Sequence, residues 1–190
     1  LVDSESPGVT ISEIPTIDTT RPVVEVVFDS VDFEIIPGGK DAIQKTIGAG
    51  RVLLAADILG ASANMINSAV EYSLERKQFN RVIGSFQSVK HMCAEMAADL
   101  EPCKSLLWYA AYAQDNIQEE GDLLSCHVKA HLSEVGQDTA RVSTQVFGGM
   151  GFTDLLGMHY WFKRIGLNRQ ILGGPEKVRQ EAARLQGFLS

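Results

Sequence analysis

Apolar residues recur at three- and four-residue steps through three consecutive stretches that fill most of this chain. The stretches run from Asp41 to about Glu75, from Ser85 to about Asn116, and from there to about Val146. This spacing places the apolar side chains on one face of an α-helix. A helix of about 30 residues is about 45 Å long, well beyond the usual globular helix. Helices of this length bury their apolar faces by packing side by side, roughly parallel or antiparallel.

Glycine and proline residues mark where these helices begin and end. Gly84 separates the first from the second, Gly121-Asp122 precede the third, and the run Gly148 to Gly151 ends it. Pro102 lies inside the second stretch, where it is expected to kink or break the helix.

Two shorter helices are expected near the C-terminus. One runs from Met158 to Asn168, and the other from Pro175 to about Leu185, with Pro175 well placed as its first residue. The sequence therefore predicts a mainly α fold, an up-down bundle of four or five helices over residues 39–190.

The first 38 residues have a different character. Val9-Thr10-Ile11 and the run Val23 to Phe28 are β-branched and apolar, and Val31, Phe33 and Ile35 alternate with polar neighbours as in a half-buried strand. Two or three such strands do not form a stable sheet alone. Residues 1–38 are therefore predicted to be the last part of a β domain that begins upstream. The start at Leu1, without Met, basic stretch or apolar signal core, also suggests a piece of a longer polypeptide.

Charge and cysteine content narrow the classes of function. Seventeen Lys and Arg against 24 Asp and Glu give a net charge of −7, which argues against nucleic-acid binding. No apolar run reaches the roughly 18 uncharged residues of a membrane span. Cys93, Cys103 and Cys126 form no C-x-x-C pair and sit in apolar helical surroundings, which favours buried thiols in a reducing compartment.

Three motifs carry a resemblance to a known family. They are the segment Tyr72 to Phe79 followed by Gln87, the segment Gln145 to Phe152, and Lys163-Arg164 with the turn Ile171 to Gly174. In this order and spacing, from Thr19 to the end, the chain resembles the C-terminal half of the acyl-CoA dehydrogenases, flavoproteins that desaturate acyl-CoA thioesters.

The resemblance implies FAD as the cofactor, an acyl-CoA substrate, and dimers or tetramers that are homo- or hetero-oligomeric. It also implies the cytoplasm, or the mitochondrial matrix in a eukaryote. The implied cofactor-binding residues are Arg76 and Phe79 toward a neighbouring subunit's FAD, Gln87 and Gln145 toward its adenosine and diphosphate, and the Gly148-Gly149 backbone. A diphosphate suits a guanidinium and exposed backbone donors.

The resemblance also locates where a catalytic base belongs. Desaturation needs a base for the α-proton, and burial can raise the pKa of a carboxylate to suit it. The family places this Glu in the turn before the last helix or, in a minority, on the first bundle helix. Here Gly173 and Gly50 stand at these two positions. The Gly173 amide can still bind a thioester carbonyl, and Glu176 is the nearest candidate for a displaced base.

The family's flavin-contacting Thr and Gln in the last helix fall on Pro175 and Lys177. Two functions stay open. The chain belongs to an FAD-dependent acyl-CoA dehydrogenase or a close relative with an unusual base or a base supplied upstream, or it is a non-catalytic subunit that supplies half of a shared FAD site. An acyl-CoA oxidase, which differs in how oxygen reaches the flavin, is a third possibility.

Other residue groups have both a functional and a structural interpretation. His127 and His131 lie one helical turn apart with Glu134 beyond, but Val128 replaces the Glu of a zinc-protease motif, so no metal site is expected.

Further groups are interpreted as follows: Met65, Met92 and Met96 as core or acyl-pocket lining, Trp108 and Tyr109 as packing or interface residues, and Lys163, Arg164 and Arg169 as a CoA-phosphate site or a solvated face.

Overall fold

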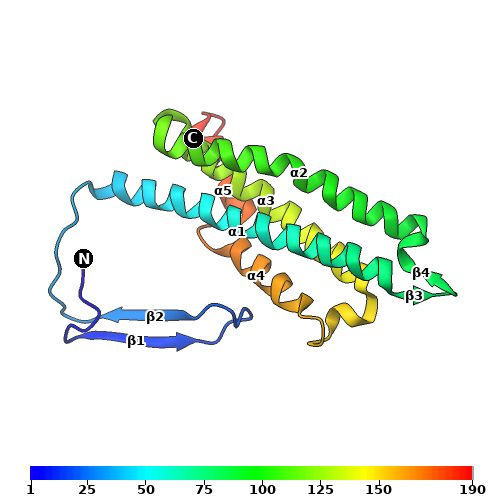
Figure 1. The fold of residues 1–190 in the computed structure, drawn as a ribbon. Coiled ribbons are helices and arrows are strands. Elements are labelled where there is room, and N and C mark those ends of the chain that lie inside the picture. The colour runs from blue at the N-terminus through cyan, green and yellow to red at the C-terminus, as the bar shows by residue number, and fades with distance from the viewer. Residues whose placement is uncertain (190) are drawn as a thin grey trace.

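Long antiparallel helices dominate the computed structural model, which describes residues 1–189 (Figure 1). The helices are α1 (Gly39–Glu75), α2 (Gln87–Asn116), α3 (Gln118–Phe147), α4 (Met158–Gln170) and α5 (Pro175–Leu185). Short 3₁₀ turns, η1 (Ile83–Ser85) and η2 (Gly148–Phe152), precede α2 and follow α3. The predicted mainly α bundle is therefore confirmed, with its two C-terminal helices where the sequence expects them.

Helix α3 lies at the centre of the bundle and contacts α1, α2, α4 and α5. It approaches α1 closely at Gly136, where an added Cβ would lie 2.4 Å from Ile58 Cγ2. The fully or nearly buried residues of the main core lie on helices α1, α2, α3 and α4: Val52, Ala55, Ile58, Ala61, Met65, Ile66, Ala69, Met96, Leu100, Cys103, Leu107, Ala110, Val128, Leu132, Ala140, Val146, Phe147, Met158 and Ile165. Met92 packs against this core, so the methionine stripe is core as predicted.

The connection between α2 and α3 differs from the expectation. Gly121-Asp122 does not precede the third helix, which begins three residues earlier at Gln118 and includes Gly121 in its first turn. Gly121 is buried there, and its carbonyl accepts a hydrogen bond of 2.6 Å from Gln114 Nε2. A glycine at this point lets the first turn of α3 lie close to the last turn of α2. Pro102 also does not break α2, which continues through it.

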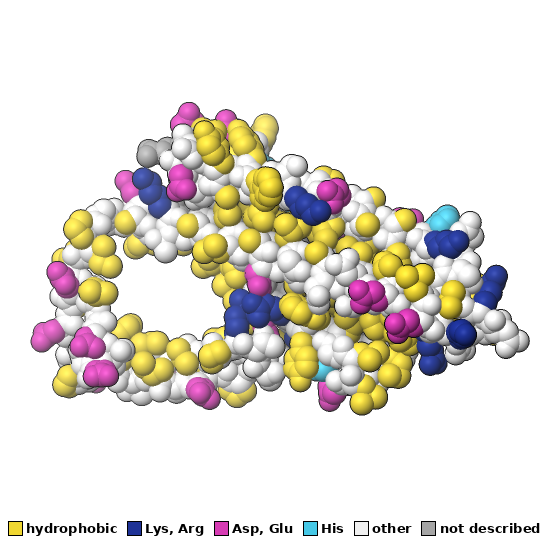
Figure 2. Space-filling view, in the orientation of Figure 1, with side chains coloured by type: hydrophobic (Ala, Val, Ile, Leu, Met, Phe, Trp, Pro, Cys, Tyr) yellow, Lys and Arg dark blue, Asp and Glu magenta, His cyan; other side chains and the backbone are white. Residues whose placement is uncertain are grey.

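The N-terminal segment forms one antiparallel hairpin of β1 (Val9–Ile14) and β2 (Val23–Phe28), with Val9 opposite Phe28. The expected third strand around Val31, Phe33 and Ile35 is wrong, because residues 31–36 have no regular secondary structure. Phe33 and Ile35 are 70% and 79% exposed, and Figure 2 shows that hydrophobic side chains are also exposed along the adjoining β1–β2 hairpin. An alternating pattern becomes a strand only when a neighbouring strand pairs with it, and none does so within the described residues.

Helix α1 is the one described helix that is long and apolar enough to cross a membrane, with an 18-residue window of mean hydropathy 1.3. Its apolar residues also supply much of the bundle core, for example Ala55, Ile58 and Met65. A core helix meets the same length and composition test, so this is weak evidence for a membrane span.

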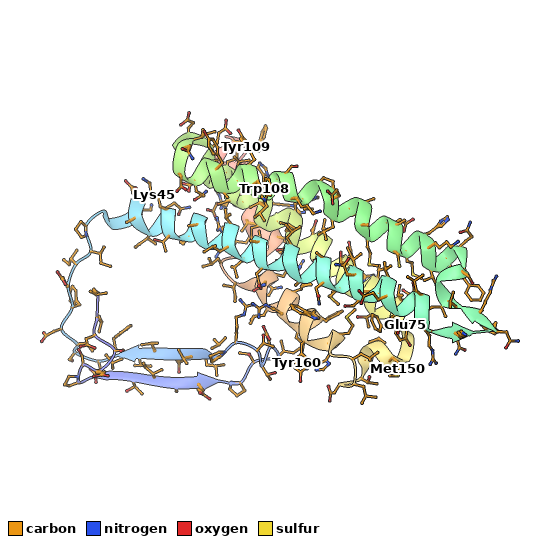
Figure 3. The ribbon with its side chains drawn as sticks, in the orientation of Figure 1. Lys45, Glu75, Trp108, Tyr109, Met150 and Tyr160 are labelled. Carbon is orange, nitrogen blue, oxygen red and sulfur yellow. The ribbon has the colours of Figure 1, made fainter. Side chains whose placement is uncertain are left out.

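The structure can be compared with the expectations for the three cysteines and for the aromatic pair Trp108 and Tyr109. The three cysteines are free, Cys103 and Cys126 being buried and Cys93 partly buried. Trp108 and Tyr109 lie on the outer side of α2 (Figure 3), and the Trp108 side chain is 77% exposed. Their assignment as packing or interface residues stays a prediction.

Candidate functional site

A groove of about 420 Å³ opens at the end of the bundle where α1 and α3 finish. It is lined by Tyr72, Arg76, Gln78, Ile83, Val146, Phe147, Gly148, Gly149 and Met150. The rings of Tyr72 and Phe147 stack with their centroids 4.4 Å apart, so one wall of the groove is aromatic. The first and second sequence motifs, about 70 residues apart in the chain, therefore meet in one place.

The hairpin after α1 positions the first motif. Arg76 directly follows α1 as its C-cap residue, and its amide donates to the Tyr72 carbonyl at 2.9 Å. Strands β3 (Lys77–Gln78) and β4 (Arg81–Val82) pair across the two-residue loop Phe79-Asn80, whose φ angles are both positive, as a tight hairpin turn requires. This turn carries the Phe79 side chain away from the bundle, where it is 87% exposed.

Gly148 ends α3 in a conformation that favours glycine, with φ 60° and ψ −140°. Its amide donates to the Gln145 carbonyl, so Gly148 shapes the backbone and its own N–H is already used. No atom lies within 4 Å of the position that a Cβ would take on Gly148 or Gly149. The backbone is therefore open to a ligand on this side.

The remaining predicted cofactor residues surround the same end of the molecule. Gln87 begins α2 and Gln145 lies in the last turn of α3, and both are exposed. Of the six predicted residues, the structure brings Arg76, Gly148 and Gly149 into the groove, and places Phe79, Gln87 and Gln145 outside its lining.

The donor set of the groove fits part of a flavin dinucleotide. Within residues 1–189, Arg76 forms no ion pair, so its guanidinium is available to an anion. An open glycine backbone and an aromatic wall lie beside it. A guanidinium and exposed backbone suit phosphate oxygens, and the aromatic rings suit a flat heterocycle.

The turn between α4 and α5 occupies the place of the expected base. Leu172 and Gly173 are consecutive left-handed residues, with φ 57° and 104°. The Gly173 amide donates to the Gln170 carbonyl at 3.2 Å, so the expectation that it is free for a thioester carbonyl is wrong in this conformation. Across from the turn, an added Cβ on Gly50 would lie 2.6 Å from Leu172 Cδ1. The two predicted base positions are therefore neighbours, and neither carries an acid.

Glu176, the predicted displaced base, lies at the start of α5 with its side chain 71% exposed. Arg169 Nη2 lies 3.1 Å from its Oε1 atom. A hydrogen bond from its own backbone amide, together with Arg169, lowers the pKa of the Glu176 carboxyl. A base for an α-proton benefits from a raised pKa, so these surroundings do not favour Glu176 in that role.

Sequence reasoning missed a buried cluster beneath the turn. Arg51 binds Glu181 through two nitrogens at 2.9 and 2.7 Å, donates to the Leu172 carbonyl at 3.1 Å, and lies 3.1 Å from Cys126 Sγ. The hydrogen bond from Arg51 lowers the pKa of Glu181, and burial raises the pKa of the Cys126 thiol to about 11. The spacing of these residues in the sequence does not predict the cluster, because the charged and thiol side chains come from three different helices.

Lys129 completes this cluster from α3. It is fully buried, and burial lowers the pKa of its ammonium group to about 8. Its Nζ atom donates to the Arg169 and Gly173 carbonyls at 3.0 and 3.2 Å, and to Ser133 Oγ at 3.3 Å.

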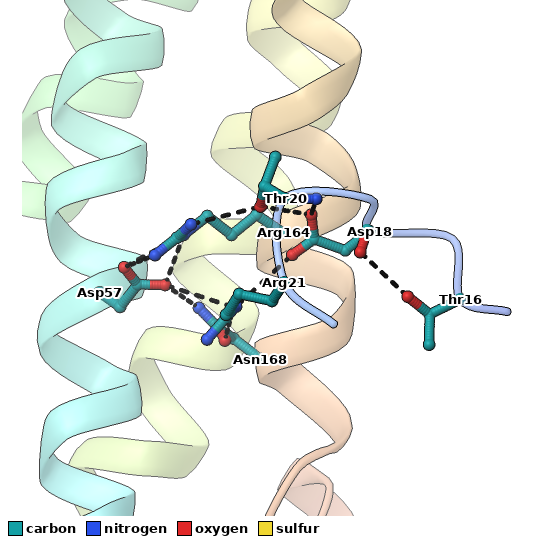
Figure 4. Close-up of polar contacts among 7 residues, drawn as sticks. All are labelled: Thr16, Asp18, Thr20, Arg21, Asp57, Arg164 and Asn168. Carbon is teal, nitrogen blue, oxygen red and sulfur yellow. Dashed lines mark hydrogen bonds and ion pairs between the residues drawn. The ribbon is translucent and has the colours of Figure 1, made fainter. Parts of the chain in front are cut away.

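A second polar network joins the β1–β2 loop to the bundle (Figure 4). Asp57 of α1 accepts hydrogen bonds of 2.8 to 3.2 Å from Arg164 and a further one from Asn168. Arg21 of the loop lies 3.5 Å from the same carboxylate and donates to Asn168. Although burial raises the pKa of Asp57, the bonds from Arg164 and Asn168 outweigh it and hold that pKa below its usual value.

The basic residues that the sequence suggested as a CoA-phosphate site, Lys163, Arg164 and Arg169, do not act together, because two of them have separate acid partners. Arg164 pairs with Asp57 and Arg169 pairs with Glu176, so neither is free for a CoA phosphate in this conformation. Among the described residues, no group of three or more His, Cys, Asp or Glu side chains lies close enough together to hold a metal ion.

An antiparallel helical bundle, with an end groove that suits a diphosphate-containing cofactor, defines the class of protein. A family model described as the C-terminal domain of acyl-CoA dehydrogenases matches residues 38–184. The chain is 34% identical over 138 residues to the short-chain-specific acyl-CoA dehydrogenase of Clostridium acetobutylicum, covering 71% of this chain and 36% of that protein. The chain belongs to the acyl-CoA dehydrogenase family.

Solved structures show the same fold. Butyryl-CoA dehydrogenase from Megasphaera elsdenii matches with a TM-score of 0.89 at 23% identity, covering 97% of this chain and 50% of that one. The ChsE4-ChsE5 complex from Mycobacterium tuberculosis matches with a TM-score of 0.90 at 22% identity, covering 100% and 52%. The chain thus spans about half the length, or less, of these relatives.

Proposed function

We propose that this chain supplies the C-terminal bundle of an FAD-dependent oxidoreductase that desaturates an acyl-CoA thioester between Cα and Cβ. The observation that carries the proposal is the groove lined both by Arg76, which has no carboxylate partner among the described residues, and by the open backbone of Gly148-Gly149. The family membership of the chain supports the same function.

The chain's own residues have distinct parts in this proposal. FAD, when bound, supplies the acceptor for the β-hydrogen. Arg76 holds negative charge of the diphosphate, and the bare backbone at Gly149 allows close approach of its oxygens. Tyr72 and Phe147 form the aromatic side of the groove, against which a flat ring of the cofactor would pack. Phe79, Gln87 and Gln145 are proposed to contact the cofactor of a neighbouring subunit.

The absence of an acid at the two positions expected for the catalytic base favours a second function. Gly50 and Gly173 have no side chain to accept a proton, and Glu176 and Glu181 both have lowered pKa values in cation-rich surroundings. In this alternative the chain is a non-catalytic subunit of a heteromeric enzyme, and another subunit supplies the acid. The ChsE4-ChsE5 complex is a structural relative whose name records two different chains.

The test uses the full-length protein purified alone. Bound flavin is measured by its visible absorbance, and a series of acyl-CoA thioesters is added without oxygen. A yellow protein whose flavin bleaches supports the first function. A colourless or unbleached protein that gains bleaching when a related subunit with an intact acid is co-purified supports the second. Absence of flavin in both preparations contradicts both.

Two further proposals concern the oligomeric state of the protein and its cellular compartment. We propose a homo- or hetero-oligomer, because a groove at the end of the bundle is open to a second subunit. The three free cysteines are compatible with a reducing compartment, the cytoplasm or a mitochondrial matrix.

A further inference from the structure

The turn between α4 and α5 contains an unfavourable backbone conformation. Leu172 has φ 57° and Gly173 has φ 104°. Glycine takes up left-handed conformations freely, but a leucine meets a steric clash between its Cβ and the backbone. Such a residue persists only when its surroundings hold it in place.

A buried cation binds the carbonyl of each of these two residues. Arg51 of α1 donates from Nε to the Leu172 carbonyl at 3.1 Å, and Lys129 of α3 donates to the Gly173 carbonyl at 3.2 Å. Arg51 is 3% exposed and Lys129 is 0% exposed. Hydrogen bonds from charged donors are stronger than neutral ones, and low dielectric surroundings strengthen them further. The turn is therefore held from two separate helices.

Both cations also form hydrogen bonds with partners outside the turn, and these bonds fix their orientation. Glu181 binds two nitrogens of Arg51, which orients the guanidinium. Lys129 also donates to the Arg169 carbonyl and to Ser133, so each of its three N–H groups has an acceptor. Donors fixed in this way order the turn at little further cost in side-chain entropy.

The conformation of the turn decides what occupies the two base positions. Leu172 Cδ1 lies where it would meet an added Cβ on Gly50 at 2.6 Å, so Leu172 takes the room beside that glycine. An added Cβ on Gly173 would lie 3.0 Å from Val178 Cγ1, in a backbone conformation that strains any other residue.

We infer that Arg51 and Lys129 are positioning residues that hold Leu172 in its left-handed conformation against Gly50, so that this chain presents an apolar side chain where a catalytic acid is expected. The first part concerns the turn alone. The second part, that this surface borders the flavin and the acyl group, rests on the proposed function.

Amide hydrogen exchange of the full-length protein tests the first part. Lys129→Met removes the donor and keeps most of the side-chain volume, and Lys104→Met, at an exposed lysine of α2, is the matched control. We expect exchange of the Gly173 and Val178 amides to increase about tenfold or more in Lys129→Met, the change expected on loss of a charged hydrogen bond, and to stay unchanged in the control. Unchanged exchange in a folded Lys129→Met protein overturns the inference.

A rescue variant separates strain from general loosening. Asparagine tolerates the left-handed region, so Leu172→Asn added to Lys129→Met is expected to restore part of the lost protection. A further loss of protection in the double variant contradicts the role assigned to strain. If Lys129→Met does not fold, Lys129→Gln retains the two N–H donors of a neutral amide, and a smaller increase in exchange at the same amides is expected.

The flavin provides a readout that separates this inference from the proposed function. In a flavin-containing protein, Lys129→Met is expected to shift the visible absorbance bands of the flavin, while Lys104→Met leaves them unchanged. Faster exchange without a spectral shift overturns the second part alone. A wild-type protein without flavin contradicts the proposed function, and the exchange result still decides the first part.

Discussion

Gly136 of α3 and Ile58 of α1 mark a point where two long helices approach so closely that a Cβ on the glycine would lie 2.4 Å from Ile58 Cγ2. Ile165 Cγ2 and Ser62 Oγ would each lie 3.3 Å from the same atom. We expect Gly136→Ala to lower the free energy of unfolding by about 1–3 kcal/mol, because the packed core has no room for the added methyl group.

Gly60→Ala is the matched control for that substitution. Gly60 also lies within a helix, α1, but no atom lies within 4 Å of its Cβ position. Alanine is expected to raise the free energy of unfolding by about 0.5–1 kcal/mol there. Denaturant unfolding of the intact protein measures both, and equal effects of the two variants would argue against the close approach.

The Arg51–Glu181 ion pair joins the first and last helices, and its arginine is almost fully buried. Removing the acid leaves an uncompensated charge in the interior, so Glu181→Ala is expected to destabilise the protein by about 3 kcal/mol or more. Asp138→Ala removes the acid of an exposed pair with Arg141 and is expected to cost about 1 kcal/mol or less. Similar losses for the two variants in urea unfolding would contradict the burial of Arg51.

The lowered pKa of buried Lys129 makes the free energy of unfolding depend on pH. Its pKa is about 8 in the folded protein and 10.5 ordinarily, so between these values the unfolded state binds more protons. The free energy of unfolding therefore rises with pH in this window, by up to ~1.4 kcal/mol per pH unit. Burial is the main cause of the lowered pKa, and the neighbouring charges of Arg51 and Arg169 lower it further.

Lys129→Met cannot make this contribution. We expect the stability difference between wild type and Lys129→Met to change in favour of the wild type from about pH 8 to about pH 10.5. Urea unfolding of both proteins across this range measures it. Parallel pH profiles for the two proteins would show that Lys129 has an ordinary pKa.

Asp57 is predicted to fasten the β1–β2 loop to the bundle. Asp57→Asn removes the charge that pairs with Arg164 and Arg21, so amide exchange in residues 16–22 is expected to increase. Because the pKa of Asp57 is below its ordinary 3.8, its stabilising contribution is present above about that pH and is lost as the pH falls through the folded value. Asp138→Asn, on the exposed face of α3, is the control. Unchanged exchange in the loop would exclude this role.

Arg76 is predicted to hold the cofactor through its charge. Arg76→Ala is expected to weaken FAD binding by roughly tenfold or more, since a charged hydrogen bond to an anion is lost. Arg184→Ala, which removes an exposed arginine in the last turn of α5, should leave the affinity unchanged. Flavin retained after gel filtration, measured by absorbance, reports the difference, and equal retention would remove Arg76 from the site.

Much of the fold follows from local sequence signals. Pro175 begins α5 and Gly148 ends α3 at the residues where the sequence indicated, because a helix start and stop depend on the conformations of a few neighbouring residues. Gly121 was expected to precede the third helix but lies inside its first turn. The glycine is needed there for a close approach between α2 and α3, which the spacing of residues in the sequence does not reveal. The alternation at residues 31–36 misled because a strand needs a partner.

The candidate site divides in the same way. By itself, the sequence indicated the long helices, the family, the three groove residues Arg76, Gly148 and Gly149, and the absence of an acid at both expected base positions, since each is a matter of residue type and spacing. Only the tertiary structure decided that Arg51, Lys129 and Glu181 gather beneath the Leu172-Gly173 turn. These residues come from α1, α3 and α5, and buried charges find their partners through the packing of distant helices.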